Sequence, residues 1–244
     1  YAEVTPLLTA LANPEGDYTV ANIRATTGHL NGQGGSSGGW TLVIVYENPT
    51  LSGKLITTFD GFARVNNGNS VNINYSGFNT IPAGPVRANM GAAALEGDFR
   101  IGGDRMQITT PSNPGFTSLS NASNPVNNFF NSNITLNGAQ MPGRTPSSMN
   151  TLGWDTDIFA LNNPANSIIA NNETSATFQF TSSGDQYYPF FNSFNIEIIE
   201  PEIVLEKKVE DIAGNDITGL GVNLGQILDY VLSFRNIEIM DLAE

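Results

Sequence analysis

The sequence predicts an all-β protein, with a β-sandwich over residues 1–200 and the opening of a second β module over residues 201–244. Two observations carry this prediction. Short segments in which apolar and polar residues alternate recur along the chain, as in strands that place one face on a core. Turn-forming residues separate them, and the 244 residues include 25 glycines and 13 prolines. A chain of this length suffices for one large β domain and part of another.

One short helix is predicted near the start of the chain. In YAEVTPLLTALA (1–12), four apolar residues follow the i, i+3, i+4, i+7 spacing of a helix face. Thr5 and Pro6 suit an N-cap and the first helical position. We therefore expect a helix over residues 6–12.

Four strands are predicted between residues 18 and 78. The segments 18–27, 54–65 and 70–78 alternate in polarity, whereas GGWTLVIVYENP (38–49) contains a continuous apolar run. Such a run is typical of a strand buried on both faces, so we expect residues 39–47 to form the central strand of the sandwich. Asn67-Gly68 accepts positive φ at little cost and predicts a hairpin between the last two of these strands.

The later part of the chain predicts further strands at 85–98, 99–109, 154–161, 175–183 and 190–211. Residues 110–150 are rich in Pro, Ser, Asn and Gly, and we interpret them as a covering or functional loop with a short strand near residues 126–136. Asn137-Gly138 is a second hairpin signal. Proline cannot donate to a ladder, so the last strand breaks at Pro201, and we place the boundary between modules near residues 200–202.

Charge and composition exclude several classes of function. The formal net charge is −13 and the ten basic residues are scattered, so we expect no nucleic-acid partner. The absence of cysteine excludes disulfides, thiolate metal sites and cysteine nucleophiles. No apolar run reaches the roughly 20 residues that span a bilayer, so we expect no transmembrane segment. Tyr1-Ala2-Glu3 is unlike the start of a signal peptide, so an exported protein of this sequence would be a processed product or a fragment.

Six stretches of the chain share a pattern with one family of surface proteins. They are YTVANIRATTG (18–28), GGWTLVIVYENPT (38–50), ITTFDGF (56–62), AALEGD (93–98) with Gly103-Asp104, NTLGWDTDIF (150–159) and ATFQFTSSGDQYYP (176–189). Together they resemble the N-terminal β domain of large bacterial and archaeal cell-surface proteins, which precedes immunoglobulin-like DUF11 (conserved-repeat) domains. LEKKVEDIAGNDI (205–217) and GQILDYVLSFRN (225–236) resemble the first strands of such a repeat.

This resemblance implies a jelly-roll-like sandwich over residues 1–200, a partial immunoglobulin-like repeat over residues 201–244 and an extracellular, adhesin-type role in attachment or display. Exported gliding and adhesion proteins of Bacteroidota are examples of this family. The implied partners are surface glycans or proteins of a cell-surface or secretion assembly. The family's upstream strands are missing here and the repeat stops after two strands. We expect such unmatched strands to leave unpaired edges, so the alternative is a structural subunit or exported passenger held in a larger assembly.

Acidic residues in two segments are candidate calcium ligands. LEGDFRIGGD (95–104) and WDTD (154–157) contribute Glu96, Asp98, Asp104, Asp155 and Asp157. Residues i and i+2 of a strand face the same side, and calcium takes hard oxygen ligands from several loops. The alternative is that these are solvated turn residues, or carboxylates paired with Arg100 and Arg105.

We expect no enzymatic activity. Paired carboxylates can cleave glycosidic bonds only at a separation that sequence does not supply, so a carbohydrate-active enzyme is the third hypothesis. His29 is the only histidine and completes no triad, and the Gly32–Gly39 run is not a phosphate loop. Aromatic residues gather between Tyr187 and Phe194, where a sandwich core is favoured over stacking on sugars.

Overall fold

The computed structural model describes residues 1–23, 37–198 and 201–238. The chain divides into two compact units, Tyr1–Ile198 and Ile199–Glu244. His29, most of the glycine run and the second half of the predicted strand 18–27 lie outside the described residues.

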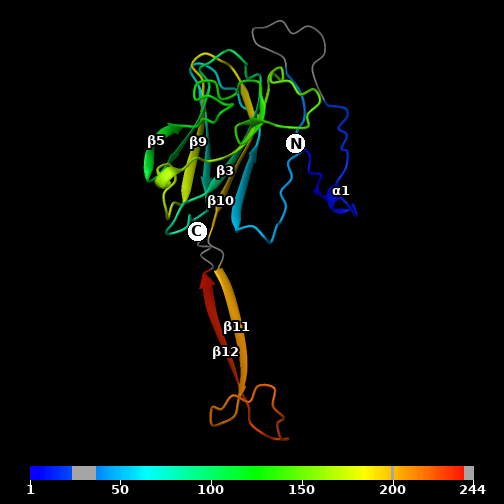
Figure 1. Cartoon of the computed structure of the whole chain (residues 1–244), viewed down its shortest axis with the longest axis vertical. Coiled ribbons are helices and arrows are strands. Elements are labelled where there is room, and N and C mark those ends of the chain that lie inside the picture. Colours follow the sequence, from blue (N-terminus) through cyan, green and yellow to red (C-terminus); the bar gives the residue numbers. More distant parts are fainter. Residues whose placement is uncertain (24–36, 199–200, 239–244) are drawn as a thin grey trace. The chain divides into compact units, whose positions relative to one another are not determined.

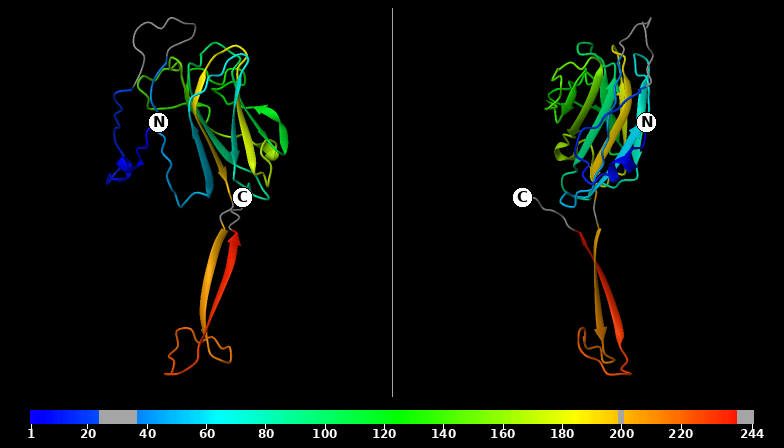
Figure 2. Two further views of the ribbon diagram at one scale, coloured as in Figure 1. Left: turned by 180° about the vertical axis from the view of Figure 1, so that it is seen from behind. Right: turned by 90° about the vertical axis from the view of Figure 1, so that its right-hand side faces the viewer.

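The first unit is a β-sandwich, which confirms the predicted fold class (Figure 1). Its larger sheet has the order β1 (Lys54–Asp60), β10 (Tyr188–Glu197), β3 (Ala88–Leu95), β8 (Trp154–Ala160), β6 (Ile134–Leu136) and β7 (Ala139–Gln140). The smaller sheet has the order β2 (Ser70–Ser76), β9 (Ser175–Thr181), β4 (Arg105–Thr110) and β5 (Asn113–Ser118). All neighbours are antiparallel except β6 and β8. Figure 2 shows the unit from behind and from the side.

The core lies between the two sheets and is rich in aromatic rings. Alternate residues of β9 and β10 are buried, as expected of strands with one face inward. Phe178 on β9 and Tyr75 on β2 both contact Phe194 on β10, with ring centroids 5.4 and 5.3 Å apart. The Tyr75 hydroxyl donates a 2.7 Å hydrogen bond to Asn192 Oδ1 and so joins the sheets. Each fully buried aromatic side chain contributes about 1.5–3 kcal/mol.

The segment between β5 and β6 covers one part of this core, as predicted for residues 110–150. Phe129 and Phe130 are buried, and their rings contact both sheets. Phe129 lies 5.7 Å from Phe159 on β8, and Phe130 lies 5.9 Å from Phe180 on β9. A polar, Asn-rich segment is therefore held in place by two adjacent aromatic residues.

The predicted central strand is absent. Residues 40–47 form no strand, and Ile44 and Tyr46 are 58% and 71% exposed; Figure 1 accordingly draws no strand before β1. The strand buried along nearly its whole length is β3, whose sequence ANMGAAAL is small rather than bulky. Gly91 shows why small residues suit it, because a Cβ there would come within 3.0 Å of Ser193 Oγ on β10. A strand is buried where other parts of the chain cover its faces. An apolar run in the sequence does not show where that cover lies.

The two predicted hairpins have different outcomes. Asn137 and Gly138 have φ of 50° and 74° and connect β6 to its antiparallel partner β7, so that hairpin is confirmed. The chain also reverses at Asn66–Asn69, where Gly68 has φ of 106°. The flanking strands nevertheless join different sheets, since β1 pairs with β10 and β2 pairs with β9. The hairpin prediction at Asn67-Gly68 was therefore wrong, because turn chemistry does not choose a strand's partner.

Other elements differ in extent from their predictions. The helix α1 spans Thr5–Thr9 only, and none of its residues is buried. Residues 18–23, the described half of the first predicted strand, have no strand structure. The predicted strands at 85–98 and 99–109 appear as β3 and β4, in opposite sheets.

The second unit contains one antiparallel pair, β11 (Pro201–Glu210) and β12 (Asp229–Glu238). Its connecting loop is organised by Asp211, whose carboxylate accepts hydrogen bonds from the Ala213 and Asn215 backbone N–H groups. None of the described side chains of this unit is buried, and Leu205 and Phe234 are largely exposed.

Candidate functional site

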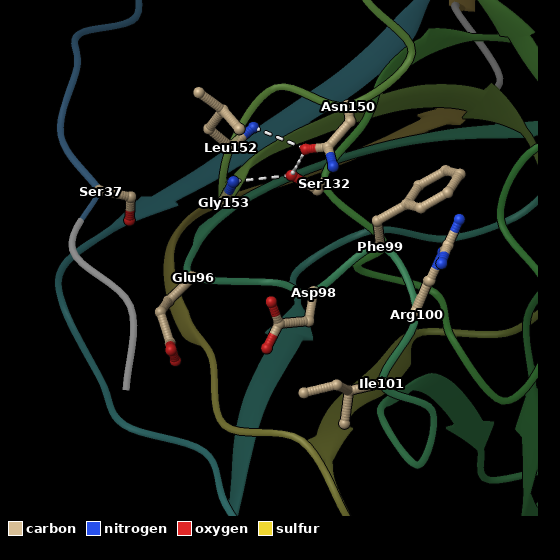
Figure 3. Close-up of a pocket in the computed structure, with 10 residues that line it drawn as sticks. All are labelled: Ser37, Glu96, Asp98, Phe99, Arg100, Ile101, Ser132, Asn150, Leu152 and Gly153. Atoms are coloured by element: carbon tan, nitrogen blue, oxygen red, sulfur yellow. Dashed lines mark hydrogen bonds between the residues drawn. The ribbon is translucent and has the colours of Figure 1, made fainter. Parts of the chain in front are cut away.

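A pocket of about 450 Å³ lies among the loops of the first unit (Figure 3). It is formed by the loop after β3, the loop before β8 and parts of two other segments. The lining residues are Ser37, Glu96, Asp98, Phe99, Arg100, Ile101, Ser132, Asn150, Leu152 and Gly153. Loops carried on a packed sandwich are common positions for binding residues.

Hydrogen bonds hold the walls of this pocket together. The Gly153 N–H donates to Ser132 Oγ at 2.6 Å, and the Ser132 hydroxyl donates to Asn150 Oδ1 at 3.0 Å. The Leu152 N–H donates to the same Asn150 oxygen at 2.9 Å. The Glu96 N–H donates to the Gly153 carbonyl at 2.6 Å and so connects the two main loops. The pocket is therefore preformed by the chain's own side-chain and backbone groups.

The backbone around the pocket is unusual. Glu96, Ser132 and Leu152 have φ of 70°, 61° and 57°, in the left-handed region that residues with a side chain rarely adopt. Such conformations cost of order 1–3 kcal/mol each and are concentrated at binding and catalytic sites. Three in one pocket lining indicate that surrounding packing, rather than local preference, sets this shape.

The predicted acidic residues divide into three groups. Glu96 and Asp98 line the pocket, and Figure 3 shows their side chains next to each other. Asp104 and Asp155 are buried, with exposures of 0% and 2%. Asp157 has different partners: its carboxylate accepts hydrogen bonds from the side chains of Thr135 and Asn121.

Asp104 and Asp155 anchor the covering segment from opposite sheets. Asp104 Oδ1 accepts the Phe130 N–H at 2.8 Å, and Asp155 Oδ1 accepts the Asn133 N–H at 3.1 Å. The second oxygen of each carboxylate is buried and has no hydrogen-bond partner among the described residues. Two carboxylates therefore bind the backbone of residues 130–133. Each retains one buried oxygen that has no hydrogen-bond partner among the described residues.

Asp185 joins this group and was missed by the sequence analysis. Its Oδ2 accepts the Asp98 N–H at 3.2 Å. A usable signal was the Gly-Asp dipeptide, because three of its four occurrences, Gly97-Asp98, Gly103-Asp104 and Gly184-Asp185, come together here. A Cβ on Gly103 would come within 3.0 Å of the Gly184 nitrogen, so these backbones pack with no room for a side chain. We call these three dipeptides the Gly-Asp cluster.

Burial dominates the electrostatics of these carboxyl groups. It raises the pKa of Asp104 to about 6, although the nearby Arg105 charge lowers it slightly. Burial raises the pKa of Asp185 to about 7, and the charges of Asp104 and Asp98 raise it further. Burial and then the charge of Asp104 raise the pKa of Asp155. Burial also raises the pKa of Asp157.

Among the described residues, Asp98, Asp104, Asp155 and Asp157 form no ion pair with a basic side chain. An ion pair does join Arg87 to Glu197, at 3.5 Å. Arg105 instead donates to Asn127 Oδ1 at 2.9 Å, and Arg100 lies 6.0 Å from the Phe99 ring centroid. For the four predicted aspartates, the alternative of pairing with Arg100 or Arg105 thus finds no ion pair in the described part of the chain.

The aromatic residues between Tyr187 and Phe194 were interpreted as core. Tyr187 and Phe194 are buried, and Tyr187 stacks on Phe130 with ring centroids 4.6 Å apart. Tyr188, Phe190 and Phe191 are half-buried, and Phe190 contacts Trp154 at 5.2 Å. The core interpretation therefore holds most clearly for the two residues that face inward.

Comparison with known proteins returned no match to any family model, curated protein or solved structure. In the described residues, no helix is both long enough and apolar enough to cross a membrane. Nor do three or more histidine, cysteine, aspartate or glutamate side chains in residues 1–23, 37–198 and 201–238 group closely enough to hold a metal ion. The pocket and the carboxyl groups next to it are thus the features from which function can be argued.

Proposed function

We propose that this protein is a non-enzymatic extracellular surface protein of the adhesin type, which mediates attachment or display by binding glycans. The observation that carries the proposal is the preformed pocket on the sandwich loops, with its three left-handed residues. A left-handed conformation at these residues costs free energy, and such conformations are concentrated at binding sites. The family resemblance of the sequence supports the same role.

The pocket has the chemistry that sugar recognition needs. Asp98 and Asn150 offer oxygens and an amide for hydrogen bonds to hydroxyl groups. Phe99 is 41% exposed beside them and offers an apolar ring face. Sugars combine hydroxyl groups with an apolar ring face, so both types of contact are required in one site.

Glycan-array binding tests this proposal. The wild-type protein should bind a limited set of glycans, and Phe99→Ala or Asp98→Ala should weaken that binding about tenfold or more, the effect of losing one central contact. Phe116→Ala is the matched control because Phe116, on β5, is also 41% exposed and does not line the pocket. Equal loss in Phe99→Ala and Phe116→Ala, or no glycan bound, would overturn the proposal. Hydrolysis of a bound glycan would favour an enzyme instead.

A second candidate function is a structural subunit or exported passenger in a cell-surface or secretion assembly. It is favoured by the exposed apolar residues of segment 40–47 and by β1, which is an edge strand of the larger sheet among the described residues. Exposed strand edges and apolar segments readily pair with other chains. Ile44→Asp should then abolish co-purification with such an assembly and leave glycan binding intact. Unchanged co-purification would count against this role.

A further inference from the structure

Buried oxygen atoms without partners gather around one segment of the first unit. Four of them belong to Asp104, Asp155, Asn128 and Asn131, which lie within or are bonded to residues 128–133. All four atoms are acceptors: Oδ2 of each aspartate and Oδ1 of each asparagine. Buried acceptors cost about 1–3 kcal/mol each when no donor or cation satisfies them. A donor or a cation bound at this place would satisfy several of these acceptors together.

Among the described residues, neither Asp104 nor Asp155 forms an ion pair with a basic side chain. Arg105 is the nearest basic residue to Asp104 in sequence, and its guanidinium bonds to Asn127 instead. Asp98 and Asp185 add two more carboxyl groups. The Tyr187 hydroxyl donates to the carbonyl oxygens of Arg105 and Thr181, and so not to these carboxyl groups. Buried carboxylates without basic partners either take up protons or coordinate a metal ion.

The geometry at Gly97 shows that oxygens from different segments converge. Asp155 Oδ2 and the Phe130 carbonyl oxygen both lie well inside 3.0 Å of the point where a Cβ of Gly97 would sit. The same Phe130 residue donates its N–H to Asp104. The Asp155 carboxylate on β8 and the Phe130 carbonyl therefore converge beside Gly97, and the Asp104 carboxylate, just before β4, binds the N–H of the same Phe130.

We propose that Asp104 and Asp155, together with the Phe130 carbonyl, bind a divalent cation with the chemistry of calcium. Calcium accepts six to eight oxygen ligands from carboxylates, carbonyls, amides and water, in flexible geometry. The described residues offer no group of three or more acidic side chains around one point, so backbone carbonyls, amides and water complete the shell. With few charged ligands the affinity belongs in the range of about 0.1–1 mM that is typical of extracellular modules. This inference is independent of glycan binding.

Asp157 provides a matched control on the same strand. It lies two residues from Asp155, faces the same side of β8 and is equally buried. Both of its oxygens accept hydrogen bonds, from Thr135 and Asn121, so Asp157, unlike Asp155, has no oxygen without a partner. Replacing each aspartate by asparagine keeps the shape and removes the charge.

Calorimetric titration and thermal unfolding of the full chain at pH 7.5 test the site. About 10 mM calcium, compared with chelator, should raise the Tm of the wild type and of Asp157→Asn by about 3–6 °C. Asp104→Asn and Asp155→Asn should lose that shift, and in chelator they should unfold no earlier than the wild type because an uncompensated charge is gone. Magnesium should act more weakly, since it demands stricter octahedral geometry.

Three results would overturn the proposal. One is a wild type that shows neither heat of calcium binding nor a Tm shift. Another is loss of the shift in Asp157→Asn to the same extent as in Asp155→Asn. The third is a calcium-induced Tm shift that persists undiminished in Asp104→Asn or Asp155→Asn. Glycan binding, measured on arrays in chelator and again in calcium, tests the proposed function separately from the calcium site.

Discussion

Gly97 lies where the loop after β3 passes over the buried carboxylate of Asp155. The Phe130 carbonyl oxygen and the Asp155 carboxylate both lie within 3.0 Å of the position that a Cβ of residue 97 would take, so there is no space for a methyl group. One of these neighbours is backbone and the other is fixed by its hydrogen bond to Asn133. The close packing therefore requires a glycine at position 97. The sequence alone suggests only a turn-forming residue there.

Gly97→Ala should lower the free energy of unfolding by about 1–3 kcal/mol, as overpacking in a close-fitting interior does. Chemical denaturation measures this. Gly115→Ala is the control, because a Cβ at Gly115 on β5 would meet no atom within 4 Å, and its effect should stay within about 0.5 kcal/mol. Equal effects at both positions would show that Gly97 is not tightly enclosed.

The raised pKa values of Asp104 and Asp185, about 6 and about 7, predict how stability depends on pH. In the unfolded chain an aspartate titrates near pH 4. The folded state holds these protons more tightly, so its stabilisation is complete below about pH 4 and is lost as pH rises to about 7. Most acidic groups that form ion pairs act in the opposite sense.

In the presence of chelator, the free energy of unfolding should therefore fall between pH 5 and pH 8. Urea denaturation at both pH values measures the difference. Asp185→Asn should make the dependence shallower, whereas Asp60→Asn, which removes an exposed carboxylate at the end of β1, should leave it unchanged. Stability that rises with pH over this interval would contradict the burial of these groups.

At the scale of elements, the segment 40–47 and strand β9 show opposite relations between sequence and structure. Segment 40–47 has the stronger apolar run but makes no strand and leaves Ile44 and Tyr46 exposed. Strand β9, with SATFQFT, alternates in polarity and pairs on both sides, with β2 and β4. Whether a backbone N–H group contributes to stability therefore depends on strand pairing and not on the apolar content of the segment.

Proline substitution separates these two situations. Val43→Pro should change the free energy of unfolding by less than about 0.5 kcal/mol, because in the described structure the Val43 N–H donates no hydrogen bond. Thr177→Pro in β9 should cost about 1–3 kcal/mol or more, since it removes a ladder donor between two partners. Chemical denaturation compares them. Strong destabilisation by Val43→Pro would place segment 40–47 in a sheet.

At the scale of the whole molecule, the two units differ in what stabilises them. Every residue of the hydrophobic core belongs to the first unit, from Val65 to Ile196. The second unit has one strand pair and no buried side chain among those described. An isolated two-stranded hairpin is marginally stable at best in water. The stability of the chain therefore resides in residues 1–198.

A protein truncated after Ile198 should fold and unfold with the same Tm as the full chain, within about 2 °C, a shift that corresponds to less than about 1 kcal/mol. Residues 199–244 alone should show no cooperative unfolding transition. Circular dichroism during heating measures both. A truncated protein that fails to fold would show that the second unit contributes to the core.

The candidate site was only partly predictable. Glu96, Asp98, Asp104 and Asp155 could be selected because two short acidic segments stand out in a chain with few charges. Asp157 was selected with Asp155 on strand periodicity alone, and its partners Thr135 and Asn121 come from a distant segment. Asp185 lies more than 80 residues from Asp104, so only the meeting of the two sheets brings their glycines together.

The sequence by itself determined the all-β class, most strand positions and the turn at Asn137-Gly138, because alternation and positive-φ residues act over a few neighbouring positions. Only the tertiary structure decided that β3, rather than residues 39–47, is the buried strand, and that β1 and β2 lie in opposite sheets. Coverage and pairing depend on segments far apart in the chain. The same long-range packing buries Asp104 and Asp155 and gives ordinary carboxyl groups their raised pKa values.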